Sequence, residues 1–135
     1  MLADERRLAA IERIKDLIPL QKKLSFAFPE DVYNVFVFGS YPTVRYEKGI
    51  SDVDIAVYAD DIDIYMRISV IIEEFFEEKG IPLDLFFIDV RNPAPIYLAP
   101  LHSQIQFTDY YPEELIRFEQ ECEAMLSQIK RGMAV

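Results

Sequence analysis

The chain has 135 residues, a formal net charge of −10 and an apolar fraction of 51%. A chain of this length buries one hydrophobic core, so we expect a single domain over residues 1–135, and the apolar content excludes a disordered chain. The negative charge disfavours DNA and RNA as partners, because their phosphate backbones repel an acidic protein.

No apolar run approaches the roughly 20 residues that cross a bilayer, and the charged N-terminal segment lacks the apolar centre of a signal peptide. We therefore expect a cytoplasmic protein with no membrane contact. The chain has one cysteine, Cys122, and one histidine, His102, which excludes an internal disulfide and a Cys/His zinc cluster. His102 is given no functional role.

The first half of the chain predicts two helical stretches and a β-hairpin. With Asp4 as N-cap, apolar residues recur at helical spacing until Pro19, and a weaker helical or irregular stretch continues to Pro29. Residues 32–38 and 52–58 are rich in β-branched and aromatic residues and predict two strands. The polar loop between them predicts antiparallel pairing.

The second half predicts a helix over 61–79, a strand over 83–88, and, after a proline-rich segment, a short strand within 104–108. A last helix runs from Pro112 to Gly132. The order strand, helix, strand predicts a right-handed parallel crossover. The expected fold is therefore α/β (α+β), a small mixed β-sheet flanked by helices.

This topology brings three separate sequence features together at one edge of the sheet. The hairpin sets Gly39 and Ser40, at the end of the first strand, beside Asp52 and Asp54, at the start of the second. The parallel crossover sets Asp84, second in its strand, at the same level. These residues are the candidate site.

The carboxylates in this set suit divalent cations. Asp52 and Asp54 alternate at i and i+2, so they share one face of the strand with Cα atoms roughly 6 to 7 Å apart. Clustered carboxylates can hold two magnesium ions roughly 3.5 to 4 Å apart on a triphosphate, and such a cluster is costly without cations. Asp89 lies at the other end of its strand and on the opposite face, so Asp84 is the better third ligand.

Gly39 and Ser40 predict a turn that holds phosphate. Glycine lets the backbone approach a phosphate closely, and the serine hydroxyl and the following amides can donate hydrogen bonds to it. Arg45 and Lys48, in the next loop, are candidates to neutralise the triphosphate tail, although such loop charges are more often only solvated. Each feature alone is more often ordinary turn or capping chemistry, and the combination favours a nucleotide site.

The segments Val37–Ser40 and Ser51–Val57 resemble the signature of polymerase-β-like nucleotidyltransferases, and the small size resembles the minimal nucleotidyltransferases among them. The resemblance implies transfer of AMP from ATP to a hydroxyl, that of a tyrosine of a HEPN ribonuclease toxin, with this chain as antitoxin in a possible hetero-oligomer. It implies that Gly39 and Ser40 bind the triphosphate and that Asp52 and Asp54 hold Mg²⁺. Asp84 completes the site and helps to deprotonate the acceptor.

The loop after the serine departs from that family pattern. Eleven residues, 41–51, separate Ser40 from Asp52, where the family has about ten. The run Tyr41–Arg45 replaces the Ala-Arg-Gly that often follows the serine, so the second glycine is missing. Nucleotide preference and catalytic rate are therefore left open.

Two other functions remain open at this point. A non-catalytic antitoxin would bind its partner through an apolar stripe on the last helix. That stripe consists of Leu115, Phe118, Cys122, Met125 and Ile129. The third possibility is a nucleotidyltransferase with a small-molecule acceptor, for which 135 residues leave little chain to build an acceptor pocket.

Overall fold

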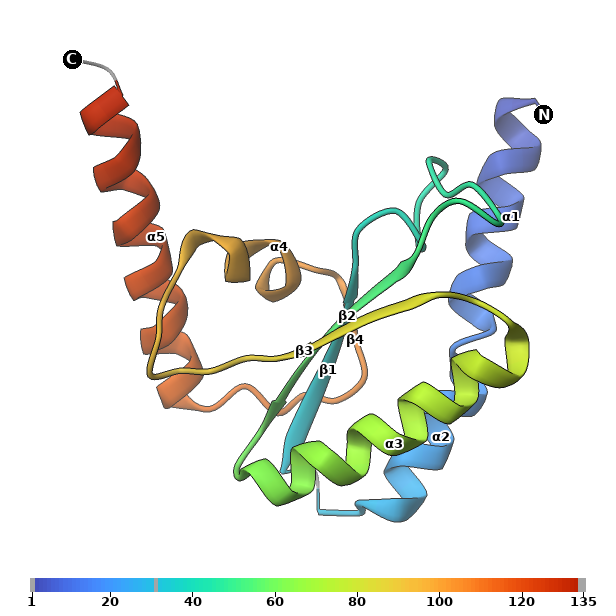
Figure 1. The fold of residues 1–135 in the computed structure, drawn as a ribbon, viewed down its shortest axis with the longest axis horizontal. Helices are drawn as coiled ribbons and strands as arrows, with labels where there is room; N and C mark the ends of the chain where they lie inside the picture. Colours follow the sequence, from blue (N-terminus) through green and yellow to red (C-terminus); the bar gives the residue numbers. More distant parts are fainter. Residues whose placement is uncertain (1, 31, 134–135) are drawn as a thin grey trace.

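A four-stranded mixed sheet with helices on both faces forms the centre of the computed structural model, which describes residues 2–30 and 32–133 (Figure 1). The elements in chain order are α1 (Ala3–Lys15), α2 (Ile18–Ala27), β1 (Tyr33–Phe38), β2 (Val53–Ala59), α3 (Ile62–Lys79), β3 (Leu83–Phe87), the 3-10 turn η1 (Pro95–Tyr97), α4 (Leu98–Leu101), β4 (Ile105–Gln106) and α5 (Glu113–Met133).

The strand order in the sheet is β3-β2-β1-β4. β1 and β2 pair antiparallel, β2 and β3 pair parallel through the α3 crossover, and β4 pairs antiparallel with β1. The predicted hairpin, parallel crossover and mixed sheet are confirmed.

Side chains alternate between the two faces of the sheet and build a separate core on each. Val35 and Ile55 face α2 and α3, where they are fully buried with Ile72. Phe36 and Ala56 face the opposite way and pack among residues of α4 and α5. In Figure 1, α2 and α3 lie on one side of the sheet, and α4 and α5 lie on the other.

The ends of α3 follow from local chemistry. The carboxylate of Asp61 accepts a hydrogen bond from the amide of Ile64 at 2.9 Å, which satisfies a donor of the first turn. Gly80 ends the helix in the left-handed conformation, with φ of 66°. The helix predicted over 61–79 is confirmed.

The N-terminal prediction is wrong in two respects. Asp4 is not the N-cap, because α1 begins at Ala3 and Asp4 lies inside the first turn. Pro19 does not end a helix: it lies in the first turn of α2, where the missing N–H costs nothing. The apolar stripe of α1 is also largely exposed, with Leu8 at 63% and Ile11 at 42%, because α1 extends beyond the sheet (Figure 1).

The burial of residues on α5 corrects the prediction that its apolar stripe is a docking surface for a partner. Leu115, Phe118 and Cys122 are buried against the sheet, so they belong to the core of the chain itself. Met125 and Ile129 are exposed at 36% and 49%, where the helix runs past the sheet (Figure 1). The stripe therefore does not form one continuous docking face.

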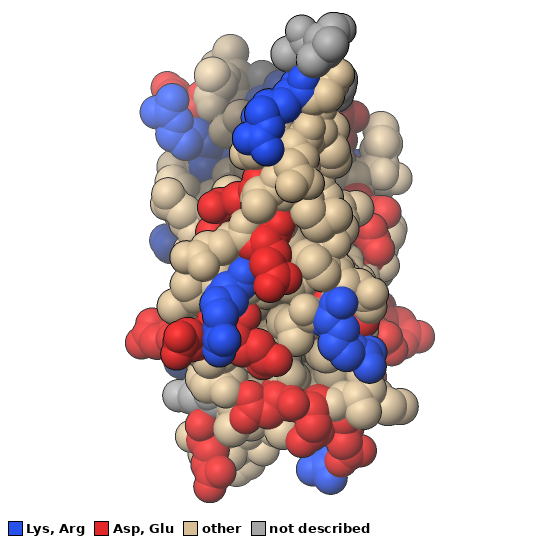
Figure 2. Space-filling model, turned by 90° about the vertical axis from the view of Figure 1, so that its left-hand side faces the viewer, with Lys and Arg blue, Asp and Glu red and all other residues tan. Residues whose placement is uncertain are grey.

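The face formed by α5 carries interspersed acidic and basic side chains, with no continuous basic surface over its described part (Figure 2). None of the helices in the described ranges has the length and apolar character needed to cross a membrane.

Candidate functional site

Asp54 and Asp84 occupy matching positions on neighbouring parallel strands. They are Cα partners in the β2–β3 register, and Asp54 is also the partner of Phe38, the last residue of β1. Asp52 directly precedes β2 and, two residues before Asp54, lies on the same face as Asp54. The structure therefore brings Asp52, Asp54 and Asp84 to the same end of the sheet, beside the turn that begins at Gly39.

Gly39 makes close contact with Asp54. Its φ of 72° lies in the left-handed region, which a side chain disfavours. A Cβ at this position would overlap Oδ2 of Asp54 and lie 3.0 Å from its Cγ. Glycine is therefore required twice here, by the backbone conformation and by the carboxylate.

Ser40 begins the loop that leads to Asp52. Its carbonyl oxygen accepts hydrogen bonds from the amide and the hydroxyl of Thr43, both at 2.8 Å, which closes a tight turn. Within the described ranges, the Ser40 hydroxyl has no hydrogen-bond partner of its own. The hydroxyl is thus available to a ligand beside the carboxylates.

The three carboxylates are crowded and unneutralised. Partial burial raises the pKa of Asp54 above its usual value, and the nearby charges of Asp84 and Asp52 raise it further. In the part of the chain that the structure describes, none of the three forms an ion pair with a basic side chain. An all-oxygen, uncompensated set of this kind fits hard divalent cations such as Mg²⁺.

Asp89 lies outside this cluster. Its carboxylate accepts hydrogen bonds from the side chains of Arg91 and Asn92 and from the backbone amide of Arg91. These contacts lower the pKa of Asp89 to about 2. Asp89 therefore has its own partners after β3, and the geometry agrees with the choice of Asp84 over Asp89.

Arg13 is a residue that sequence reasoning missed. Its Nε donates to the carbonyl of Tyr41 at 2.6 Å and its Nη2 donates to the carbonyl of Thr43 at 2.7 Å. Its guanidinium lies 4.5 Å from the ring centre of Tyr46. α1 thereby fixes the loop that follows Ser40. No local pattern could reveal the contact, because it joins segments about 30 residues apart.

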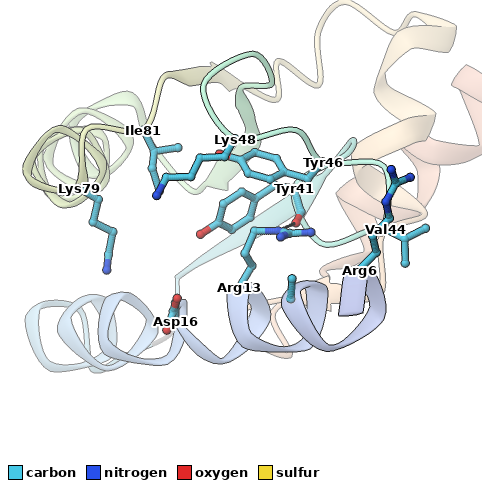
Figure 3. Close-up of a pocket in the computed structure, with 10 residues that line it drawn as sticks. Arg6, Arg13, Asp16, Tyr41, Val44, Tyr46, Lys48, Lys79 and Ile81 are labelled. Atoms are coloured by element: carbon cyan, nitrogen blue, oxygen red, sulfur yellow. Dashed lines mark hydrogen bonds between the residues drawn. The ribbon is translucent and has the colours of Figure 1, made fainter. Parts of the chain in front are cut away.

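The second loop cation, Lys48, lines a pocket between the loop and α1 (Figure 3). Its role toward the triphosphate tail stays a prediction. Arg45 is exposed.

His102 belongs to a separate group of polar side chains. Its Nε2 lies 3.2 Å from Glu119 and 3.4 Å from Glu123, and among the described residues this is the one set of three whose ligand atoms all lie within 4.8 Å of one another. The three aspartates do not form a group this tight. Glu119 also accepts a hydrogen bond from the hydroxyl of Tyr111, so one member of the His102 group is already engaged.

The sequence was compared with protein-family models and with curated proteins. The family model described as nucleotidyltransferase domain matches residues 17–121. A search of curated proteins found no match.

Two solved structures show the same fold. A substituted MntA–HpeT toxin–antitoxin complex contains a chain with 16% identity and a TM-score of 0.52, covering 82% of this chain and 87% of that one. The complex of a tri-AMPylated Shewanella oneidensis HEPN toxin with MNT antitoxin contains a chain with 16% identity and a TM-score of 0.50, covering 91% of both chains. At this identity the likeness is one of fold.

Proposed function

Since this chain belongs to the nucleotidyltransferase domain family, we propose that it transfers AMP from ATP to a tyrosine hydroxyl of a HEPN ribonuclease toxin and so acts as that toxin's antitoxin. One observation carries the proposal: Asp54, the register partner of Asp84, is in close contact with Gly39. This contact joins a turn suited to phosphate with carboxylates suited to cations. The fold likeness to a chain from a complex of AMPylated toxin and antitoxin supports the choice of acceptor.

In this mechanism the turn and the carboxylates have separate tasks. Ser40 binds the triphosphate through its hydroxyl and the amides that follow it, and Gly39 allows the close approach. Asp52, Asp54 and Asp84 are the residues that would hold Mg²⁺. When bound, two such ions supply electrostatic stabilisation of the triphosphate and of the leaving pyrophosphate.

Transfer then requires one proton acceptor. The acceptor hydroxyl attacks the α-phosphorus of ATP, a new P–O bond forms, and the bond from the α-phosphorus to the bridging oxygen of pyrophosphate breaks. Asp84, on β3, is exposed, and we assign to it the proton of the attacking hydroxyl. The products are the AMP-modified tyrosine and pyrophosphate.

The alternative of an antitoxin that acts only by binding loses its proposed anchor, because three residues of the α5 stripe are buried in the core. The test is to incubate the chain with a HEPN toxin, ATP and Mg²⁺ and to measure the intact mass of the toxin. We expect a mass increase by whole AMP units, located on tyrosine, with loss of ribonuclease activity. An unmodified toxin that is nevertheless inhibited would contradict transfer as the function.

A further inference from the structure

A pocket of about 460 Å³ lies between α1, the loop of residues 39–52 and the end of α3 (Figure 3). Six of its lining side chains carry the argument: Arg6, Arg13, Lys48, Lys79, Tyr41 and Tyr46. Four of these are basic, and Asp16 is the one acidic residue of the lining. In a chain of net charge −10, this concentration of positive charge marks a site for an anion.

The positive charges of the pocket are not consumed by ion pairs. No salt bridge within the described ranges involves any of the four basic residues. The Nζ of Lys79 lies 4.9 Å from the ring centre of Phe75, and Arg13 uses two of its N–H groups on loop carbonyls. Lys48 and Lys79, which lie toward the same end of the pocket, thus remain available to phosphate oxygens (Figure 3).

The rest of the lining is apolar or aromatic. Ala9, Val44 and Ile81 contribute aliphatic surface, and the half-buried ring of Tyr46 contributes aromatic surface, with the buried ring of Tyr41 packed edge to face against it at 5.2 Å. A simple inorganic anion would not use this surface, whereas a ligand with a flat apolar ring and several phosphates would use both parts. The volume lies within the range of about 300 to 1,000 Å³ typical of small-molecule sites.

The pocket is distinct from the carboxylate site. Tyr41 and Ile81 pack in the core on the α2 and α3 side of the sheet. Asp54 alternates with Ala56, which faces the α4 and α5 side. The two sites therefore lie on opposite sides of the sheet, and the loop of residues 39–52 contributes to both.

We propose that this pocket is a second nucleotide site, which takes a nucleoside diphosphate or triphosphate without a metal ion. The phosphates contact Lys48 and Lys79 at one end of the pocket, and the base packs toward Ala9 and Val44 at the other, beside the ring of Tyr46 (Figure 3). Occupancy restrains the loop, whose turn at Ser40 is closed by Thr43 and held by Arg13. The site thereby couples nucleotide concentration to the geometry of the phosphate-holding turn, and it exists whether or not the chain transfers AMP.

The test is isothermal titration of the chain with ADP in the presence of EDTA. Chelation of divalent cations leaves the aspartate cluster repulsive to phosphate, so binding under these conditions reports the pocket. We expect one ADP per chain, with affinity weakened at least about tenfold in the double variant Lys48→Gln, Lys79→Gln. The matched control Lys22→Gln, Lys130→Gln removes the same charge elsewhere and retains wild-type affinity.

Three results would overturn the proposal. They are absence of ADP binding at millimolar concentration, unchanged affinity in the double pocket variant, and equal affinity for pyrophosphate and ADP, which would show that the base makes no contact. Circular dichroism checks that the double variant is folded, and Lys48→Gln alone, in the exposed loop, supplies a second variant that is expected to weaken binding in the same way. None of these measurements depends on AMP transfer, so the two proposals fail separately.

Discussion

Gly39 is packed so closely against Asp54 that a Cβ atom at Gly39 would overlap the carboxylate oxygen Oδ2. The end of β1 and the start of β2 are therefore in direct contact at the point where a phosphate-holding turn and a cation-holding carboxylate are both needed. Because the two residues are so close, even the methyl group of alanine would not fit at position 39 without displacing Asp54.

Replacing Gly39 by alanine tests this contact. Gly39→Ala adds the left-handed strain of roughly 1 to 2 kcal/mol and also displaces Asp54, so we expect loss of AMP transfer and of magnesium-dependent ATP binding. Gly49→Ala is the matched control, because Gly49 has φ of 83° but no atom within 4 Å of an added Cβ. It should lose only about 1 to 2 kcal/mol of unfolding free energy and keep ATP binding. Equal losses of binding in both variants would contradict the contact as the cause.

Asp84 and Asp89 form a second matched pair. Asp84→Asn removes the proposed proton acceptor and a cation ligand, so transfer should fall roughly 100-fold or more. Asp89→Asn disturbs only the hydrogen bonds with Arg91 and Asn92 and should leave the transfer rate close to wild type. Single-turnover rates with saturating ATP distinguish the two. A large loss in Asp89→Asn with none in Asp84→Asn would reverse the assignment.

Arg13 is expected to position the loop. Arg13→Ala removes two hydrogen bonds to loop carbonyls and the contact with the ring of Tyr46, and about 1 to 3 kcal/mol of unfolding free energy should be lost. The loop would then hold the turn at Ser40 less firmly, so KM for ATP should rise more than kcat falls. Arg13→Lys keeps the positive charge but cannot make both hydrogen bonds in the same geometry, so its KM for ATP should lie between those of the wild type and Arg13→Ala. A fall in kcat with unchanged KM would contradict a positioning role.

The stability of the fold should decline in alkali. Burial, together with the nearby charges of Asp16 and Tyr46, raises the pKa of Tyr41 to about 12, and burial is the largest cause. The folded state thus binds the tyrosine proton more tightly than the unfolded state, in which tyrosine ionises near pH 10. The stabilisation is complete below pH 10 and is lost as the pH rises toward 12. Unfolding in urea at pH 9, 10 and 11 should show this decline.

The variant Tyr41→Phe removes that ionisation, so its unfolding free energy should fall less steeply above pH 10. Asp16→Asn removes one cause of the raised pKa, and we expect Tyr41 to ionise at lower pH when absorbance at 295 nm is followed. An unchanged slope in Tyr41→Phe would contradict Tyr41 as a source of the alkaline loss.

The sheet could be predicted because its signals are local. The strands containing Val35 and Ile55 have dense β-branched sequence, α3 has a helical period with Asp61 and Gly80 as caps, and the crossover rule fixes the position of Asp84 beside Asp54. The residues of the candidate site followed from this topology. Their catalytic roles remain proposals.

The surroundings of the site could not be predicted because they depend on contacts distant in the chain. Helical spacing in α1 does not reveal that Leu8 is exposed, since the sheet ends before the helix does. The link from Arg13 to the loop, the pocket beside it and the approach of His102 to Glu119 arise only once the helices are packed. Each of these contacts joins segments that are distant in the sequence, and no helical or strand pattern in the sequence indicates that they meet.

The most direct test of the account is transfer of label from ATP, labelled on its α-phosphate, to a HEPN toxin in the presence of Mg²⁺, compared between the wild-type chain and the variants Asp54→Asn and Asp89→Asn. The account predicts labelled toxin with the wild-type and Asp89→Asn chains and none with Asp54→Asn, although all three remain folded. Labelling by Asp54→Asn at the wild-type rate would show that the carboxylates beside Gly39 do not carry out the transfer.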